Sequence, residues 1–191
     1  YANIGLKTVL ADYDPLGGAM DWVAQRPSKY PKIKGVPAFS SGLRIPRGTE
    51  ILVSDAPART HGDQLVALMR KAHTVIIPVM PSPVDMRAAR RFLAELHDVR
   101  HRVKTDVKLV TVASRVREGT RVLRDLEDYL HDRRLSGRRL HCLTILRQNA
   151  NYLRAAERGL SIFEFAPGQT WEDRAYWAPL TLSLIHISEP T

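Results

Sequence analysis

The sequence has 191 residues, and the hydrophobic ones, 44% of the total, are spread evenly along it. This length and pattern allow one substantial core and give no reason to divide the chain into two domains. Cys142 is the only cysteine, which excludes an internal disulfide, and no segment approaches the roughly 20 apolar residues that a membrane span needs. With no secretion signal at its start, the chain is predicted to be a soluble protein of the reducing cytoplasm.

Positive charge is concentrated in one part of the chain. Lys and Arg outnumber Asp and Glu by 29 to 20, and the stretch from Arg87 to Arg139, with 15 basic and eight acidic residues, holds seven of the nine excess charges. A clustered basic face suits a polyanion such as DNA or RNA. A solvated arginine-rich surface explains the charge equally well.

The chain begins with a pattern typical of a helix end, followed by a strand and a tight loop. Tyr1 to Gly5 is typical of a last helical turn that Gly5 stops. A strand is predicted over Lys7–Ala11, and it leads into Asp-Tyr-Asp-Pro-Leu-Gly-Gly. Ligands of open α/β sheets bind at the carboxyl ends of strands, so Asp12 and Asp14 are candidate site residues.

The remaining elements alternate between strands and helices. Strands are predicted at 49–55, 74–80, 107–113 and 140–146, helices at 19–25, 63–72, 84–102, 120–130, 151–158 and from 170 onward, and a surface excursion without a sustained period at 26–47. This alternation predicts an α/β fold with three layers, in which a mostly parallel twisted sheet carries helices on both faces. We expect residues 1–181 to form one domain.

Four pieces of the chain resemble motifs of the ParA/MinD-type ATPases and occur in the same order as in that family. They are Asp12-Tyr13-Asp14-Pro15, Asp55-Ala56-Pro57, Val75-Ile76-Ile77-Pro78-Val79 and Ala155-Ala156-Glu157-Arg158-Gly159-Leu160-Ser161-Ile162. The likeness extends from about Gly5 to Trp177. It implies a fold of the P-loop NTPase type and an ATPase that dimerises around two ATP molecules. In such proteins hydrolysis serves to position DNA or another cargo.

The resemblance also implies roles for individual residues, with ATP and Mg²⁺ as cofactors. Asp14 matches the catalytic aspartate that orients or activates the attacking water, and Asp12 matches the aspartate that supports the magnesium site. Asp55 matches the Walker B aspartate, which holds the magnesium shell through water. Other expected nucleotide-binding positions are Pro15, Gly17 and, at the start of the loop that senses the γ-phosphate, Pro57. Phosphoryl transfer requires a positioned water and metal-balanced charge, which such carboxylates provide.

The family's Gly-rich phosphate loop, with its two lysines and threonine, has no counterpart in these 191 residues. We expect this loop and the strand before it to lie upstream of Tyr1, so that the parent protein hydrolyses ATP and the present chain does not. In the family that strand lies inside the sheet, so its neighbours are expected to have unpaired backbone groups and the chain to be unstable. Residues 182–191 match the translation of a sequencing adapter and are expected not to be native.

The partners that the resemblance implies are a second copy of the chain, a centromere-binding or activator protein, and DNA. Arg117 and Arg121 follow the fourth predicted strand, in the region where family members bind DNA without sequence preference. Plasmid or chromosome partition in the cytoplasm, with nucleoid association, is the expected setting. Two alternatives stay open, which are a metabolic P-loop synthetase of the same fold and a non-catalytic adaptor that keeps the dimer surface.

Overall fold

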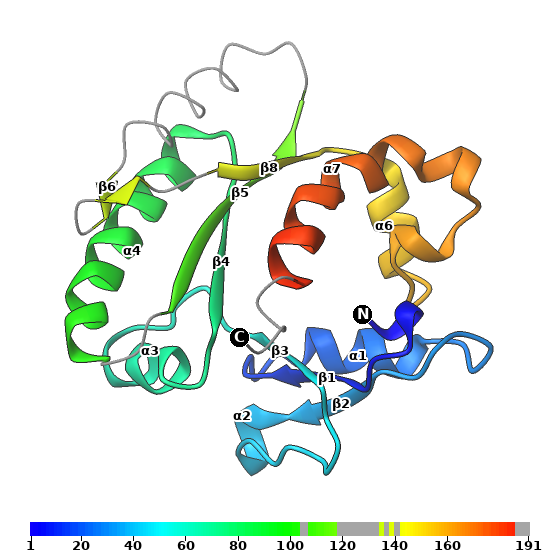
Figure 1. Ribbon diagram of the computed structural model, residues 1–191, viewed down its shortest axis with the longest axis horizontal. Helices are drawn as coiled ribbons and strands as arrows, with labels where there is room; N and C mark the ends of the chain where they lie inside the picture. The colour runs from blue at the N-terminus through cyan, green and yellow to red at the C-terminus, as the bar shows by residue number, and fades with distance from the viewer. Residues whose placement is uncertain (104–106, 118–133, 136–137, 140–141, 186–191) are drawn as a thin grey trace. The chain divides into compact units, whose positions relative to one another are not determined.

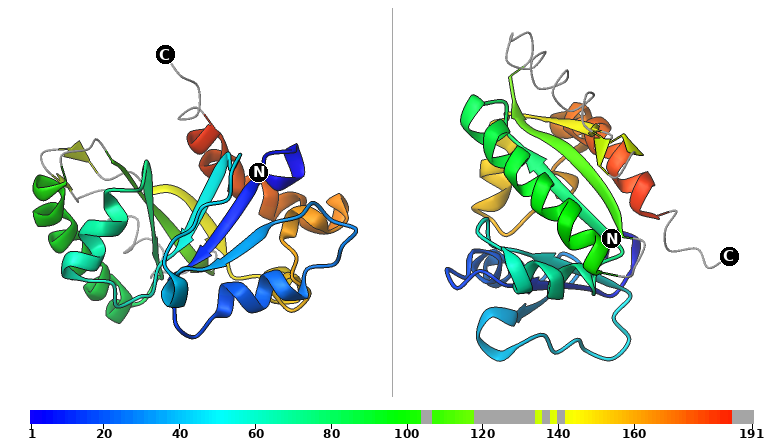
Figure 2. Two further views of the ribbon diagram at one scale, coloured as in Figure 1. Left: turned by 90° about the horizontal axis from the view of Figure 1, so that it is seen from below. Right: turned by 90° about the vertical axis from the view of Figure 1, so that its left-hand side faces the viewer.

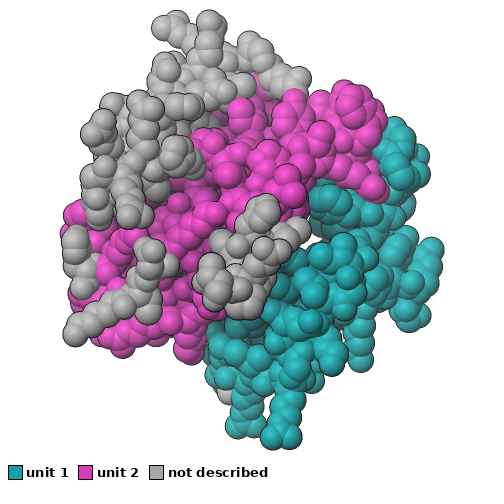
Figure 3. All heavy atoms as spheres, in the orientation of Figure 1, with its two compact units in different colours: residues 1–60, 150–169 teal, residues 61–149, 170–191 magenta. Residues whose placement is uncertain are grey.

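The computed structural model describes residues 1–103, 107–117, 134–135, 138–139 and 142–185 (Figure 1). The chain divides into two compact units, of which unit 1 comprises residues 1–60 and 150–169 and unit 2 comprises residues 61–149 and 170–191 (Figure 3). Each unit contains a three-stranded parallel sheet accompanied by helices. The predicted α/β class is therefore confirmed, with the strands hydrogen-bonded as two sheets. The helix predicted at 120–130 lies outside the described residues.

Unit 1 is built around strand β1. Its elements are η1 (Ala2–Ile4), β1 (Thr8–Asp12), α1 (Gly18–Gln25), β2 (Lys34–Pro37), α2 (Ala38–Ser41), β3 (Ile51–Asp55), α6 (Ala150–Ala156) and η2 (Ile162–Glu164). The sheet order is β2-β1-β3, and both pairings are parallel. β1 has a partner on each side, and Val9 and Ala11, which project from the same face of the sheet, are buried.

The prediction of a surface excursion over residues 26–47 is wrong in part, because this stretch contains β2 and α2. Only Val36 in β2 is a strong strand former, so the local sequence lacks the alternation that identifies a strand. The strand forms because its backbone pairs with β1, with Val36 opposite Ala11, and this pairing buries the Val36 side chain.

Unit 2 has helices on both faces of its sheet. Its elements are α3 (Gly62–Met69), β4 (Thr74–Val79), α4 (Pro83–Arg102), β5 (Lys108–Val116), β6 (Arg134–Leu135), β7 (Arg138–Arg139), β8 (Cys142–Arg147) and most of α7 (Pro167–Ile185). The order of the parallel sheet is β4-β5-β8, and β6 and β7 form a separate antiparallel pair. Figures 1 and 2 show α4 along one side of this sheet and α7 along the other.

Alternation along β5 explains this arrangement. Leu109 and Ala113 pack into the cluster formed with α3 and α4, whereas Val110 and Val112 pack with Leu180 of α7. Successive side chains of a strand point to opposite faces of the sheet, so the near-continuous apolar sequence of β5 supplies both faces. A strand was predicted over 107–113, and the structure places β5 at Lys108–Val116.

β3 and β4 are edge strands, each in its own sheet, but both have the apolar composition that is typical of a central strand. β3 and β4 are short apolar runs, yet each pairs with one strand only among the described residues. Val53 of β3 is 44% exposed and Ile76 of β4 is 42% exposed, so each of these strands leaves an apolar side chain open to solvent. The apolar run around Val53 predicts a buried strand, and that prediction is wrong at this residue. Parallel strands of this composition are normally covered on both sides.

Helix α7 is longer than predicted, because it begins at Pro167 and not at Thr170. It continues to Ile185 and so includes the first four residues of the segment 182–191, whose origin stays a prediction. In this segment Leu184 packs beside Leu180, and the Lys108 ammonium donates to the Ser183 hydroxyl at 2.6 Å. Among the described helices, none combines the length and apolar character that crossing a bilayer requires.

Candidate functional site

Two of the predicted site residues lie side by side at the carboxyl edge of the unit 1 sheet. Asp12 ends β1 and Asp55 ends β3, and the two are opposite each other in the parallel register. The next residue on the first strand, Tyr13, donates its backbone N–H to the Asp55 carbonyl oxygen at 2.9 Å. This edge is where open α/β sheets bind ligands.

Asp12 is completely buried, and its carboxylate accepts three backbone N–H groups. Oδ1 accepts from Asp14 at 2.9 Å, and Oδ2 accepts from Ala19 at 3.1 Å and Met20 at 3.2 Å. The last two amides belong to the first turn of α1, whose N–H groups have no partner within the helix. The observed contacts of Asp12 are therefore those of a carboxylate that caps α1 and closes the loop before it. Its support of a magnesium ion stays a prediction.

The loop between β1 and α1 is a tight turn held by its own polar groups. Asp14 Oδ1 accepts the Leu16 N–H at 3.0 Å, and the Asp14 carbonyl oxygen accepts the Gly17 N–H at 3.0 Å. Gly17 has φ of +72°, a left-handed conformation that suits glycine. Pro15 and Leu16 are exposed, and Leu16 reaches 87% exposure. The turn holds Asp14 at the site edge and presents an apolar side chain to the surroundings.

Asp55 differs from Asp12 and Asp14 in the surroundings of its carboxylate. Partial burial raises its pKa, and the nearby charges of Asp12 and Asp14 raise it further. Among the residues that the structure describes, none donates a hydrogen bond to its side chain. No group of three or more His, Cys, Asp or Glu residues is arranged as a metal cage within the described ranges. A magnesium ion that keeps its water shell, with a single carboxylate accepting hydrogen bonds from that water, would fit this donor set.

The segment after β3 forms a compact turn. The Pro57 carbonyl oxygen accepts both the backbone N–H of Thr60, at 3.0 Å, and its hydroxyl, at 2.7 Å. Thr60 is buried, so this turn is internally satisfied. The backbone therefore places Pro57 two residues beyond Asp55, and its predicted contact with nucleotide stays a prediction.

In unit 2 the start of α3 is capped by a residue from another helix. Glu95 of α4 accepts the Gly62 backbone N–H at 2.8 Å, and its second oxygen lies 2.7 Å from Nδ1 of His61. The Gly62 N–H, followed by the His61 contact, holds the pKa of Glu95 below its ordinary value. The loop predicted to sense a γ-phosphate runs from Pro57 to His61, so the contact of Glu95 with His61 is at the last residue of that predicted loop.

Of the two predicted DNA-binding arginines, the structure describes Arg117. Arg117 is exposed, and its Nε donates to Oε1 of Gln148 at 2.9 Å. Arg121 lies outside the described residues. Binding of DNA by this pair therefore stays a prediction.

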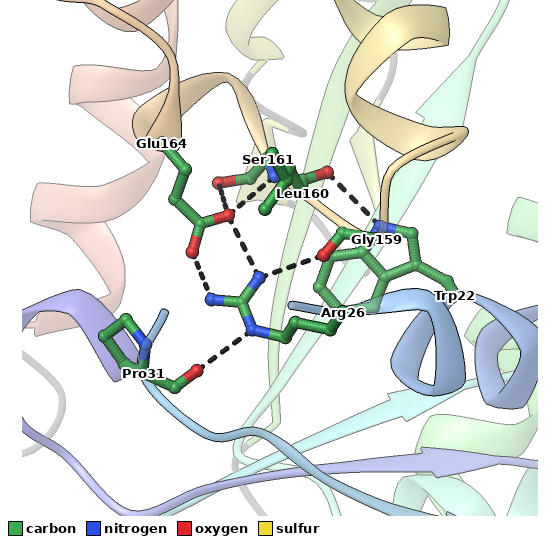
Figure 4. Close-up of polar contacts among 7 residues, drawn as sticks. All are labelled: Trp22, Arg26, Pro31, Gly159, Leu160, Ser161 and Glu164. Atoms are coloured by element: carbon green, nitrogen blue, oxygen red, sulfur yellow. Dashed lines mark hydrogen bonds and ion pairs between the residues drawn. The ribbon is translucent and has the colours of Figure 1, made fainter. Parts of the chain in front are cut away.

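Sequence reasoning missed a buried polar cluster in unit 1, around Arg26 and Glu164 (Figure 4). These two side chains form an ion pair, with 5% and 4% of their side-chain surface exposed. One local signal was present: Glu164 stands three residues after Ser161, and together they form a capping box at η2. Nothing in the local sequence indicates that Arg26 is the partner, because the two residues are 138 positions apart.

These features define an α/β protein whose parallel sheets and flanking helices are consistent with the P-loop NTPase type of fold. The fold is similar to that of the MinD cell division protein of Aquifex aeolicus, with a TM-score of 0.67 and 15% identity over 99% of this chain and 88% of that chain. A structure of the MinC:MinD cell division protein complex of the same organism gives a TM-score of 0.64 and 16% identity, and the match covers 100% of this chain and 87% of that chain. No family model and no curated protein matches the sequence.

Proposed function

We propose that this chain is part of a ParA/MinD-type ATPase that uses ATP-dependent dimerisation to position a cargo. The observation that supports this most is the placement of Asp12, Asp14 and Asp55 at one strand edge of a fold similar to MinD. Carboxylates in this position suit phosphoryl transfer, which depends on positioning and on balanced charge rather than on covalent chemistry.

Each carboxylate has a different task in this proposal. Asp55 holds the water shell of Mg²⁺, since its side chain has no hydrogen-bond donor among the described residues, while partial burial and the nearby charges of Asp12 and Asp14 raise its pKa. Asp14 orients the attacking water from a loop that its own hydrogen bonds hold in place. Asp12 fixes that loop and the start of α1. When bound, the metal ion balances charge on the phosphate groups.

The exposed edge of β3 supports a further strand in the parent protein. β3 has an apolar sequence and a 44% exposed Val53, and its outer backbone groups pair with no described strand. We propose that the strand carrying the phosphate loop pairs there. Its N–H groups and lysines supply the phosphate contacts, since the 191-residue sequence has no Gly-rich loop with two lysines.

The partners follow the same proposal. One solved neighbour is a complex of MinD with MinC, which supports a protein partner as well as a second copy of the chain. Nonspecific DNA binding through Arg117 and Arg121 would place the protein on the nucleoid, in the cytoplasm. Contacts between arginines and DNA phosphates weaken steeply as the salt concentration rises, so the salt dependence of binding distinguishes a DNA partner from a protein partner.

ATP hydrolysis by the parent protein, expressed with its upstream sequence, tests the proposal. Asp14→Asn is expected to lower kcat by about 100-fold or more, because a positioned water is lost. Asp63→Asn is the matched control. It removes the same charge from an aspartate on α3 whose side chain is 95% exposed. Equal activity of the two variants would contradict the assignment of Asp14. Micromolar ATP binding by the present 191-residue chain would contradict the need for an upstream loop.

A further inference from the structure

Helix α1 connects the Asp14 loop to the rest of unit 1, and its position depends on polar contacts at both ends. It has eight residues, or about 12 Å of helix, and none of its side chains is fully buried. Met20 and Val23 lie over Gly35 of β2, which gives it a small apolar contact. A helix with so little burial requires other contacts to keep one orientation.

The amino end of α1 is held by Asp12, as described above. Ala19 and Met20 donate their backbone N–H groups to the buried Oδ2 of this residue. Asp14 donates to the other oxygen of the same carboxylate. One side chain thus ties the loop and the first turn of the helix to β1.

The carboxyl end of α1 is held by the buried Arg26 (Figure 4). Its guanidinium donates from Nε to the Pro31 carbonyl oxygen at 2.9 Å and from Nη1 to the Gly159 carbonyl oxygen at 3.0 Å. Nη1 also donates to Oε2 of Glu164 at 3.0 Å, and Nη2 pairs with Oε1. The Trp22 indole N–H donates to the Leu160 carbonyl oxygen at 3.2 Å.

The segment that receives these bonds has hydrogen bonds of its own and lies close to the helix end. Glu164 Oε2 accepts the Ser161 backbone N–H at 2.8 Å, which closes the capping box. A Cβ on Gly159 would lie 2.5 Å from the Arg26 backbone nitrogen, so the two backbones are in direct contact. A displacement of this segment must therefore displace Arg26.

We propose that Arg26 and Glu164 are positioning residues that hold α1 in register and thereby fix the loop that carries Asp14. The role of Asp14 in ATP hydrolysis rests on the proposed function, whereas the coupling of the ion pair to the loop does not. Neither residue touches the site edge. They act through the helix, whose two anchors lie about 10 Å apart along its axis.

Amide hydrogen exchange on the parent protein, expressed with its upstream sequence and kept free of nucleotide, tests this coupling. In Glu164→Gln, exchange at the Ala19 and Met20 amides is expected to become about tenfold faster, while the amides of β1 keep their protection. Glu157→Gln is the matched control, because Glu157 is exposed in the same part of the chain and loses the same charge. Its exchange rates are expected to stay within about twofold of the unmodified chain.

Trp22→Phe provides a second variant in case Glu164→Gln does not fold. It removes one hydrogen bond from the same anchor and keeps an aromatic ring, and we expect about threefold faster exchange at the same two amides. Unchanged rates at Ala19 and Met20 in a folded variant would overturn the proposal, and so would a uniform increase that includes β1. Faster local exchange without any ATP hydrolysis by the parent protein would support the coupling and reject the proposed function.

Discussion

The ion pair between Arg26 and Glu164 leads to a prediction about stability that a double-mutant cycle can measure. Arg26→Met keeps most of the side-chain volume but leaves the Glu164 carboxylate, 4% exposed, with only its Ser161 contacts. Breaking a buried pair in this way costs about 3–5 kcal/mol, since the remaining charge is uncompensated. This is a large share of the roughly 5–15 kcal/mol by which domains are typically stable.

Urea unfolding of the two single variants and the double variant at pH 7 gives the coupling free energy. Glu164→Gln is expected to destabilise by about 2–4 kcal/mol, and the double variant by clearly less than the sum of the two, with coupling of about 2 kcal/mol. Arg102 and Asp63 provide the control pair, because their contact at 3.3 Å is 59% and 95% exposed. Coupling there is expected to be below about 0.5 kcal/mol. Additive effects at Arg26 and Glu164 would refute the reasoning.

Other features give further expected outcomes. Burial opposes ionisation of Glu164, but its bonds to a guanidinium and a backbone amide outweigh this and lower its pKa, so its contribution to stability is complete above its ordinary pKa of 4.5. That contribution is lost as the pH falls through the lower folded value, and unfolding midpoints of Glu164→Gln and the unmodified chain should converge in acid. The pKa of Asp55 is raised, so Asp55→Asn should increase stability at pH 7 by roughly 0.5 kcal/mol after solvent screening, measured by urea unfolding. Gly159→Ala should destabilise by about 3 kcal/mol or more because its Cβ has no room, whereas Gly17→Ala, with open space, should cost about 1 kcal/mol. Loss of the Ser82 cap of α4 in Ser82→Ala should lower the free energy of unfolding by about 1 kcal/mol.

Local signals were enough to predict most elements of this protein. A helix was predicted over 84–102 after an extended exit at Pro81-Ser82-Pro83, and the structure begins α4 one residue earlier, at Pro83, with Ser82 as its N-cap. Gly5 was predicted to stop a helical turn, and it follows η1 with φ of +90°. Such signals act within a few residues of the chain, so they can be recognised without knowing what the segment packs against.

The position of Asp12 at a strand end was also predictable, but its contacts were not. A run of apolar residues followed by Asp, Pro and Gly indicates a strand that opens into a turn. Whether the carboxylate faces a ligand or the amides of Ala19 and Met20 depends on how α1 returns over the strand. Only the three-dimensional path of the chain decides this.

By itself, the sequence determined the alternation of strands and helices, the apolar character of the strands and the acidic strand ends, because each depends on neighbouring residues. Tertiary structure decided which strands pair, and hence that β2 exists and that β3 lies at an edge with Val53 exposed. It also joined Arg26 to Glu164 across 138 positions. Contacts at such separation leave no periodic pattern in the sequence, since they are selected by the packing and hydrogen bonding of the whole unit.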